Sequence, residues 1–202
     1  MATSRDRILD GALEVMRSRG LARATIKKIA RAAGVSEALL YKLFADKTDL
    51  LLCVFAERLP WGMALREDVT DHVGKRTVAA NLTRMLIEIE QIFDASMPIA
   101  MALFSDVELM AREVEALQAR GGPGPGILIQ HVSDYLRAEQ VAGRVRTGVP
   151  IDAAATTLVA TSLHHAFAAF FYVGGRGEDR KKAFGVLADG VVATVLNGIA
   201  PD

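Results

Sequence analysis

The sequence has few cysteines, few aromatic residues and no net charge. Its 202 residues include one cysteine, Cys53, and aromatic residues make up 6% of the chain. A single thiol excludes a disulfide framework and any zinc site built from several cysteines. A hydrophobic fraction of 51% is too high for a disordered protein. The first residues, MATSRDRILDG, lack the apolar stretch of a signal peptide, so we expect a cytoplasmic protein.

The absence of net charge argues against a polyanionic partner only if the charges are spread evenly. They are not, because residues 1–48 carry ten Lys and Arg against five Asp and Glu, a net charge of +5. The remaining 154 residues therefore carry −5. A small basic segment on a larger acidic body is consistent with nucleic-acid binding, and equally with a solvated face of chance asymmetry. Charge alone leaves both interpretations open.

Long alternating apolar and polar runs are also missing, whereas apolar residues recur at helical spacing almost throughout. The pattern predicts an all-α fold of about nine helices. Proline, glycine and capping residues set their ends. The predicted helices span about 4–19, 26–33, 36–44, 46–59, 76–95, 98–120, 127–142, 151–172 and 179–198, with Pro98 opening the sixth. GGPGPG at 121–126 and GGRGE at 174–178 are loops, and 144–150 is a connector, with a short strand as the lesser alternative.

Residues 153–175 contain no charged residue and are long enough to cross a bilayer as a helix. Polar residues such as Thr156, Ser162 and His164 interrupt this run, and no basic cluster precedes it, so we reject a membrane span. The helices predicted at 151–172 and 179–198 are both apolar on more than one side. A monomer of this size can bury one such helix, so we expect a second copy to cover the other.

Residues 25–47 contain two short predicted helices joined by a turn at Gly34. Glycine permits the positive φ that such a turn needs, and Ala30 is small where the helices must cross. The shared core is predicted to contain Ile29, Val35, Leu40 and Phe44. This is the helix-turn-helix pattern, in which the second helix enters the DNA major groove. Many helical proteins contain such a pair, but this one coincides with the basic segment and follows a helix that can brace it.

The residues of this stretch resemble the DNA-binding head of the TetR (TetR/AcrR) family of one-component transcriptional regulators. The similarity lies in the spacing of Gly20, Thr25, Ile29, Ala30, Ala33, Gly34, Val35, Ser36, Leu40, Tyr41, Phe44, Lys47 and Leu50. It implies a homodimer that binds a palindromic operator, usually as a repressor released by a small molecule. It also implies a DNA-binding domain at 1–47 and a ligand-binding and dimerisation domain at 48–202, whose last two helices form the dimer interface. The helix that begins near Asp46 then connects the two domains, and we expect it to transmit the effect of the ligand to the DNA-binding domain.

The resemblance assigns DNA contacts residue by residue. Phosphate contacts fall on Thr25, Tyr41 and Lys47, and base or groove contacts fall on Ser36, Glu37, Ala38 and Lys42. Lys27 completes the predicted DNA-binding set. Two positions depart from the family: Leu43 stands where His or Tyr commonly donates to phosphate, and Ala38 replaces a common glycine.

Large, adaptable side chains on the later helices predict a pocket for a small apolar or aromatic effector. The predicted ligand-binding residues are Met85, Ile89, Phe93, Met97, Met101, Phe104, His131, Tyr135, His164, Phe167 and Phe171. Taken singly, each is explained better by core packing, so the pocket rests mainly on the resemblance. His164 and His165 point about 100° apart on one helix, so we expect no metal site. No cofactor is expected.

Two other classes compete with a regulator. Catalysis is not expected, because the sequence shows no Ser-His-Asp order, phosphate loop or metal-ligand spacing. The alternative kept open is a helical carrier or sequestering protein for a hydrophobic ligand, with a head that does not bind DNA.

Overall fold

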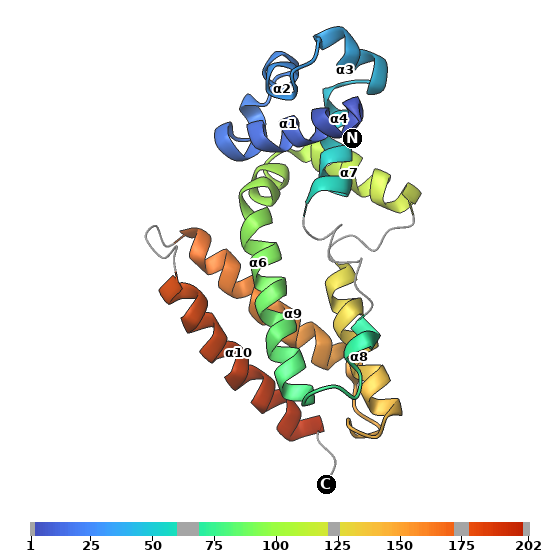
Figure 1. Cartoon of the computed structure of the whole chain (residues 1–202), viewed down its shortest axis with the longest axis vertical. Coiled ribbons are helices and arrows are strands. Elements are labelled where there is room, and N and C mark those ends of the chain that lie inside the picture. The colour runs from blue at the N-terminus through green and yellow to red at the C-terminus, as the bar shows by residue number, and fades with distance from the viewer. Residues whose placement is uncertain (1–2, 60–68, 121–125, 172–177, 200–202) are drawn as a thin grey trace. The chain divides into compact units, whose positions relative to one another are not determined.

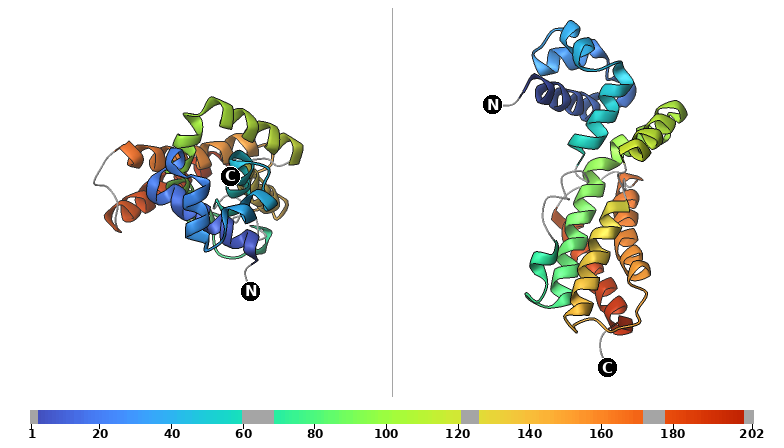
Figure 2. Two further views of the ribbon diagram at one scale, coloured as in Figure 1. Left: turned by 90° about the horizontal axis from the view of Figure 1, so that it is seen from above. Right: turned by 90° about the vertical axis from the view of Figure 1, so that its right-hand side faces the viewer.

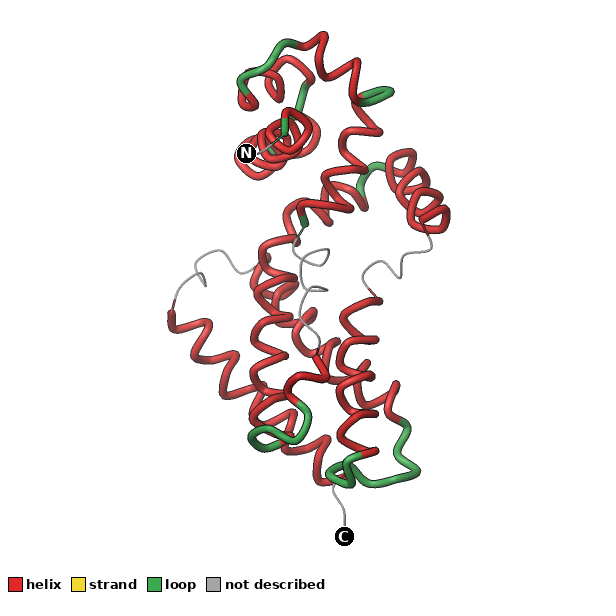
Figure 3. Tube along the Cα trace, turned by 45° about the vertical axis from the view of Figure 1, so that its right-hand side comes forward, coloured by secondary structure: helices red, strands yellow, loops and turns green. Residues whose placement is uncertain are grey.

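The computed structural model describes residues 3–59, 69–120, 126–171 and 178–199. Over these ranges the fold is all-α, as predicted: nine α-helices and two short 3-10 helices, with no strand (Figure 3). The chain divides into two compact units, 1–63 with 96–123, and 64–95 with 124–202. The long helix α6 (Val78–Phe104) contributes one part to each unit.

The first unit contains α1 (Ser4–Arg19), η1 (Leu21–Arg23), α2 (Ile26–Ala33), α3 (Glu37–Leu43), α4 (Lys47–Arg58), the end of α6 and α7 (Val107–Arg120) (Figure 1). The first four α-helices end within one residue of their predicted limits. Side-chain oxygens of Thr3, Thr25, Ser36 and Asp46 accept backbone N–H groups at the helix starts. Capping oxygens are local in sequence, which is why these ends could be predicted.

The crossing of α1 and α2 depends on a glycine in the middle of α1. A Cβ placed on Gly11 would lie 2.9 Å from the backbone nitrogen of Ala33. Around this crossing the core contains Ile8, Leu9 and Ala12 of α1, all fully buried. The backbones of the two helices therefore approach each other at Gly11 more closely than an alanine at position 11 permits.

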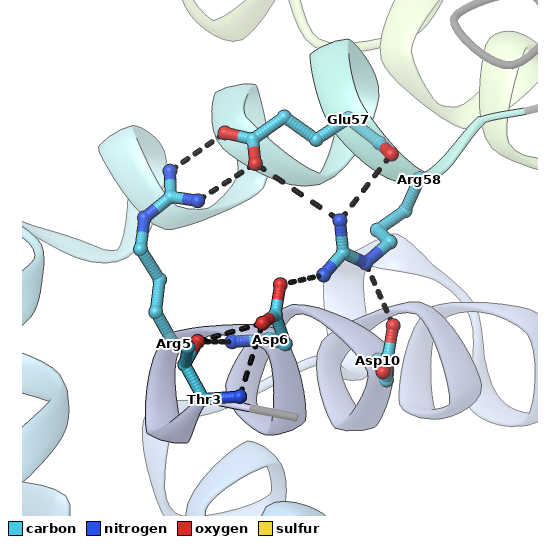
Figure 4. A network of polar contacts seen from close by, with 6 residues as sticks. All are labelled: Thr3, Arg5, Asp6, Asp10, Glu57 and Arg58. Carbon is cyan, nitrogen blue, oxygen red and sulfur yellow. Dashed lines mark hydrogen bonds and ion pairs between the residues drawn. The ribbon is translucent and has the colours of Figure 1, made fainter. Parts of the chain in front are cut away.

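Ion pairs join the start of α1 to the end of α4 (Figure 4). The guanidinium of Arg58 donates to Asp6 Oδ1 at 2.6 Å and to Asp10 Oδ1 at 2.7 Å. Arg5 donates to both carboxylate oxygens of Glu57, at 2.6 and 2.7 Å. The Thr3 hydroxyl bond and the Arg58 pair lower the pKa of Asp6 to about 2, and Arg5 lowers the pKa of Glu57. These charged contacts hold α4 against α1.

Replacing Arg58 with methionine is expected to lower the free energy of unfolding at neutral pH. A carboxylate whose folded pKa is depressed stabilises the fold above its unfolded pKa and loses that contribution as pH falls toward the folded value. For Asp6 this window runs from about pH 4 down to about 2. Urea unfolding at pH 7 and pH 3 should show the cost of Arg58→Met shrinking at the lower pH, with Arg19→Met as the control. A cost independent of pH would contradict the role given to these carboxylates.

The prediction that Pro98 opens a new helix is wrong. Helix α6 continues through Pro98 to Phe104, and the break falls at Ser105 and Asp106. Proline removes one N–H within a helix, but its neighbours Met97 and Ile99 are buried, and this packing outweighs the lost bond. The new helix α7 starts where Asp106 Oδ1 accepts the N–H of Leu109 at 3.0 Å.

The second unit contains the first part of α6, η3 (Val69–His72), α8 (Ile127–Val141), α9 (Ile151–Phe171) and α10 (Glu178–Ile199). Helix α9 packs against α8 and α10 (Figure 2). The predicted loop at 121–126 and turn at 174–178 lie almost wholly outside the described residues, and the α8–α9 connector contains turns only. Across the described ranges, none of the helices combines the length and apolar character needed to span a membrane.

Candidate nucleic-acid interface

The turn between α2 and α3 has the geometry that the sequence predicts for a helix-turn-helix. Gly34 lies in the left-handed region with φ +65° and ψ +39°. The Val35 N–H donates to the Ala30 carbonyl at 3.0 Å, which closes α2 before the chain turns. Ser36 Oγ then accepts the Leu39 N–H and starts α3. A residue with a Cβ would strain the turn at position 34, so the glycine is required there.

Helix α3 has one buried side and one exposed side. Leu40 is 1% exposed and Phe44, just after the helix, is 4% exposed, so both anchor α3 in the core of the first unit. Tyr41 is 61% exposed, and Glu37, Ala38 and Lys42 are also exposed. The structure thus leaves free the α3 side chains that were predicted to reach DNA.

Thr25 and Ser36 cap the N-termini of α2 and α3 and are also exposed to solvent. Their hydroxyl oxygens accept the N–H groups of Lys28 and Leu39, at 3.4 and 3.3 Å. Because a hydroxyl accepts and donates at once, each O–H proton stays available to a phosphate oxygen. Lys47 lies in the first turn of α4, where it is half-buried, and Lys27 is exposed on α2.

Part of the unpaired positive charge of the first unit lies on side chains predicted to contact DNA. Within the described ranges, Lys27, Lys42 and Lys47 form no ion pair, whereas Arg5 is neutralised by Glu57. The acids Asp6 and Asp10 of α1 share the single cation Arg58. Pairing therefore offsets part of the acidic charge of α1, and Lys27, Lys42 and Lys47 are among the cations of the first unit left to attract an anion.

The predicted ligand-binding residues are divided between the two units. Met97, Met101 and Phe104 belong to the first unit. Those in the second are Met85, Ile89, Phe93, His131, Tyr135, His164, Phe167 and Phe171, the side chain of the last lying outside the described residues. Their grouping into one pocket stays a prediction.

The structure shows the burial and the contacts of several of these side chains. Tyr135 is fully buried, and its hydroxyl donates to Glu139 at 2.8 Å and accepts from Asn81 at 2.9 Å. His164 and Phe167 are exposed on α9. The neighbouring His165 contacts Glu90 at 3.0 Å and stacks on Phe184. The buried positions Glu90 and Glu139 were not identified from sequence, because an isolated glutamate in a helix usually indicates a solvated face.

Comparisons with known proteins confirm the predicted resemblance of the N-terminal segment. Residues 8–54 match the family model for bacterial regulatory proteins of the tetR family. The HTH-type transcriptional regulator SrpR of Pseudomonas putida is 44% identical over 55 residues, which cover 27% of this chain and only 26% of SrpR. The family-model match spans most of α1, the helix-turn-helix and the greater part of α4, and this chain covers about a quarter of the length of SrpR.

Solved structures with the same fold extend over nearly the whole chain. A candidate TetR-family transcriptional regulator from Mesorhizobium loti superimposes with a TM-score of 0.82 at 19% identity, covering 98% of this chain and 97% of that one. The transcriptional regulator FadR of Bacillus subtilis, solved in complex with stearoyl-CoA, gives a TM-score of 0.62 at 20% identity, covering 96% and 98%. At these identities the likeness concerns the fold.

Proposed function

We propose that this chain, whose residues 8–54 match the family model for bacterial regulatory proteins of the tetR family, is a ligand-responsive transcriptional regulator that binds a palindromic operator as a homodimer. The observation that carries the proposal is the exposed side of α3, with Tyr41 61% exposed and Lys42 free of ion pairs among the described residues. A short helix with a buried anchor and a polar outer side fits the major groove. Repression is the proposed mode, with release by a small molecule.

The proposed contacts divide into those that position the protein and those that read sequence. Thr25, Tyr41 and Lys47 contact phosphate, and Lys27 adds positive charge beside them. Ser36, Glu37, Ala38 and Lys42 face the base edges. Leu43 is 40% exposed at the end of α3 and has no group that can donate to phosphate, so this protein uses one backbone contact fewer than a relative with His or Tyr there.

The proposed dimer interface consists of the exposed sides of α9 and α10. Exposed residues of α9 between 153 and 170 include no Asp, Glu, Lys or Arg. They include Leu163 and Phe167, which are 43% and 42% exposed, and α10 exposes Val186 and Leu187 at 72% and 43%. An α9 surface without charge, together with large exposed apolar side chains on α10, is typical of an interface between subunits.

The proposed effector is small and largely apolar. Met85, Ile89 and Phe93 of α6 are buried in the second unit, where adaptable side chains can accept an apolar guest. The stearoyl-CoA bound to FadR makes long-chain acyl compounds the first class to test. An effector releases DNA only if it binds the released state more tightly, so operator affinity must fall when it is present. Equal affinities with and without a compound exclude that compound as the inducer.

Lys47→Ala is expected to weaken binding to all DNA sequences alike, because an ammonium on phosphate carries no base information. The slope of log K against log salt should become shallower by about 0.9. Band-shift titrations at several salt concentrations measure both effects, with Lys75→Ala in the second unit as a control of equal charge. Unchanged affinity in Lys47→Ala would remove this lysine from the interface.

A further inference from the structure

A pocket of about 380 Å³ lies within the first unit, between η1, the start of α4, the end of α6 and the start of α7. None of the residues in the predicted ligand-binding set lines it. Its volume falls within the range of small-molecule sites in proteins. The pocket is therefore a separate candidate site, next to the helix-turn-helix.

The lining has an apolar part and two opposite charges. Leu21, Leu51 and Leu109, each 6% exposed or less, form the buried side of the apolar part, which Ala22, Ala102 and Val107 complete. Lys47 supplies an ammonium group and Asp106 a carboxylate, and within the described residues these two do not pair with each other. Asp106 Oδ1 accepts the Leu109 N–H, which orients the carboxylate and leaves its other oxygen available.

The helices that form the pocket are fixed to one another. Arg112 of α7 donates to Asp46 Oδ2 at 3.2 Å, next to Lys47 in the chain. Asp46 also caps α4 by accepting the Asp49 N–H at 2.7 Å. Leu21, Leu51 and Leu109 belong to one continuous core cluster. Contacts of this kind fix the backbone positions of Lys47 and Asp106 before a ligand arrives, which lowers the entropic cost of binding.

We propose that this pocket binds a small zwitterion with an apolar side chain, of the class of hydrophobic α-amino acids. The ligand's carboxylate pairs with Lys47, its ammonium with Asp106, and its side chain lies on the three leucines. A simple fatty acid fits less well, because its carboxylate can pair with Lys47 but the molecule has no cation to pair with Asp106. Since the proposed function uses Lys47 as a phosphate contact, a ligand held by this ammonium competes with the operator for it.

The test begins with the free full-length protein and no DNA, so that its outcome does not depend on operator binding. Isothermal titration with L-leucine should give saturable binding. 4-Methylpentanoate, which is leucine without the ammonium, should bind more weakly by at least about tenfold, the effect of one charged hydrogen bond. Leucinamide, which lacks the carboxylate, should also bind more weakly.

Asp106→Asn should weaken leucine binding by at least about tenfold and leave 4-methylpentanoate unaffected or bound more tightly. Asparagine caps a helix as well as aspartate does, so α7 should remain intact. Glu115→Gln is the matched control, because it removes a charge at an exposed position of the same helix. It should bind leucine like the parent protein. With a known operator, leucine should lower operator affinity in the parent protein and not in Asp106→Asn.

Three results would overturn the proposal. The first is no saturable leucine binding to the parent protein up to about 10 mM, a level that covers millimolar dissociation constants. The second is equal leucine affinity in the parent and Asp106→Asn proteins. The third is equal affinity for leucine and 4-methylpentanoate. If the protein binds leucine but no DNA, the proposed amino-acid site stands and only the proposed regulatory function is refuted.

Discussion

Gly11→Ala is expected to lower the free energy of unfolding of the first unit by about 1–3 kcal/mol, the usual cost of an overpacked contact. The added methyl group would lie 2.9 Å from the backbone nitrogen of Ala33, and a backbone atom cannot move aside as a side chain can. Helix propensity predicts the opposite sign, since alanine at a mid-helix glycine is favoured by about 1 kcal/mol. A lower free energy of unfolding would therefore show that the contact with Ala33 outweighs helix propensity, and a higher one would show the reverse.

Chemical denaturation followed by circular dichroism measures this change. Glu14→Ala, at an exposed position of the same helix, is the control and should shift stability by less than about 0.5 kcal/mol. Operator affinity of Gly11→Ala should fall as well, because the crossing of α1 and α2 supports the turn at Gly34. A variant as stable as the parent protein, or more stable, would mean that the two helices do not cross this closely.

Val186→Glu is expected to convert the proposed dimer to monomers, with a dimer dissociation constant raised at least about 100-fold. By two-fold symmetry each interface receives two new carboxylates, and burying an unpaired charge costs several kcal/mol. Operator affinity should fall by a comparable factor, because a monomer contacts one half-site instead of two.

Sedimentation equilibrium and band shift on the same preparations measure the two effects. Val141→Glu is the matched control, since Val141 is 91% exposed at the end of α8, a helix that is not part of the proposed interface. It should leave both the dimer and operator binding unchanged. A dimeric Val186→Glu protein would place the subunit interface elsewhere on the chain.

The structure also refines the role expected of the connector helix. Leu50, Val54 and Phe55 of α4 are buried in the core of the first unit, and Arg58 pairs with Asp6 and Asp10 of α1. We therefore expect helix α4 to move together with α1 if the first unit moves as a body. The predicted end of the DNA-binding domain at residue 47 stays a prediction. By packing, α4 belongs to the same compact unit as α1, α2 and α3.

Local signals made the helix-turn-helix predictable. Thr25, Ser36 and Asp46 cap helices through bonds that span three residues, and Gly34 marks the turn by its own conformational freedom. Such information lies within short stretches of sequence. The bounds of α1 to α4 and the exposed side of α3 could therefore be obtained without a structure.

Features that depend on distant residues could not be predicted. The effect of Pro98 depended on the burial of Met97 and Ile99, which is a tertiary property. Gly11 was not identified, because its role depends on a backbone atom 22 positions later in the sequence. The pocket lined by Lys47 and Asp106 joins segments that sequence spacing does not relate.

Selection of bound sequences from a pool of random duplexes, using the full-length protein, shows whether this chain recognises an inverted DNA repeat. We expect enrichment of such a repeat, because two copies of α3 related by two-fold symmetry would read two half-sites. The Lys47→Ala protein should enrich the same repeat with lower affinity. No enrichment over the starting pool, from a protein that still binds apolar ligands, would contradict the account and favour a hydrophobic-ligand carrier.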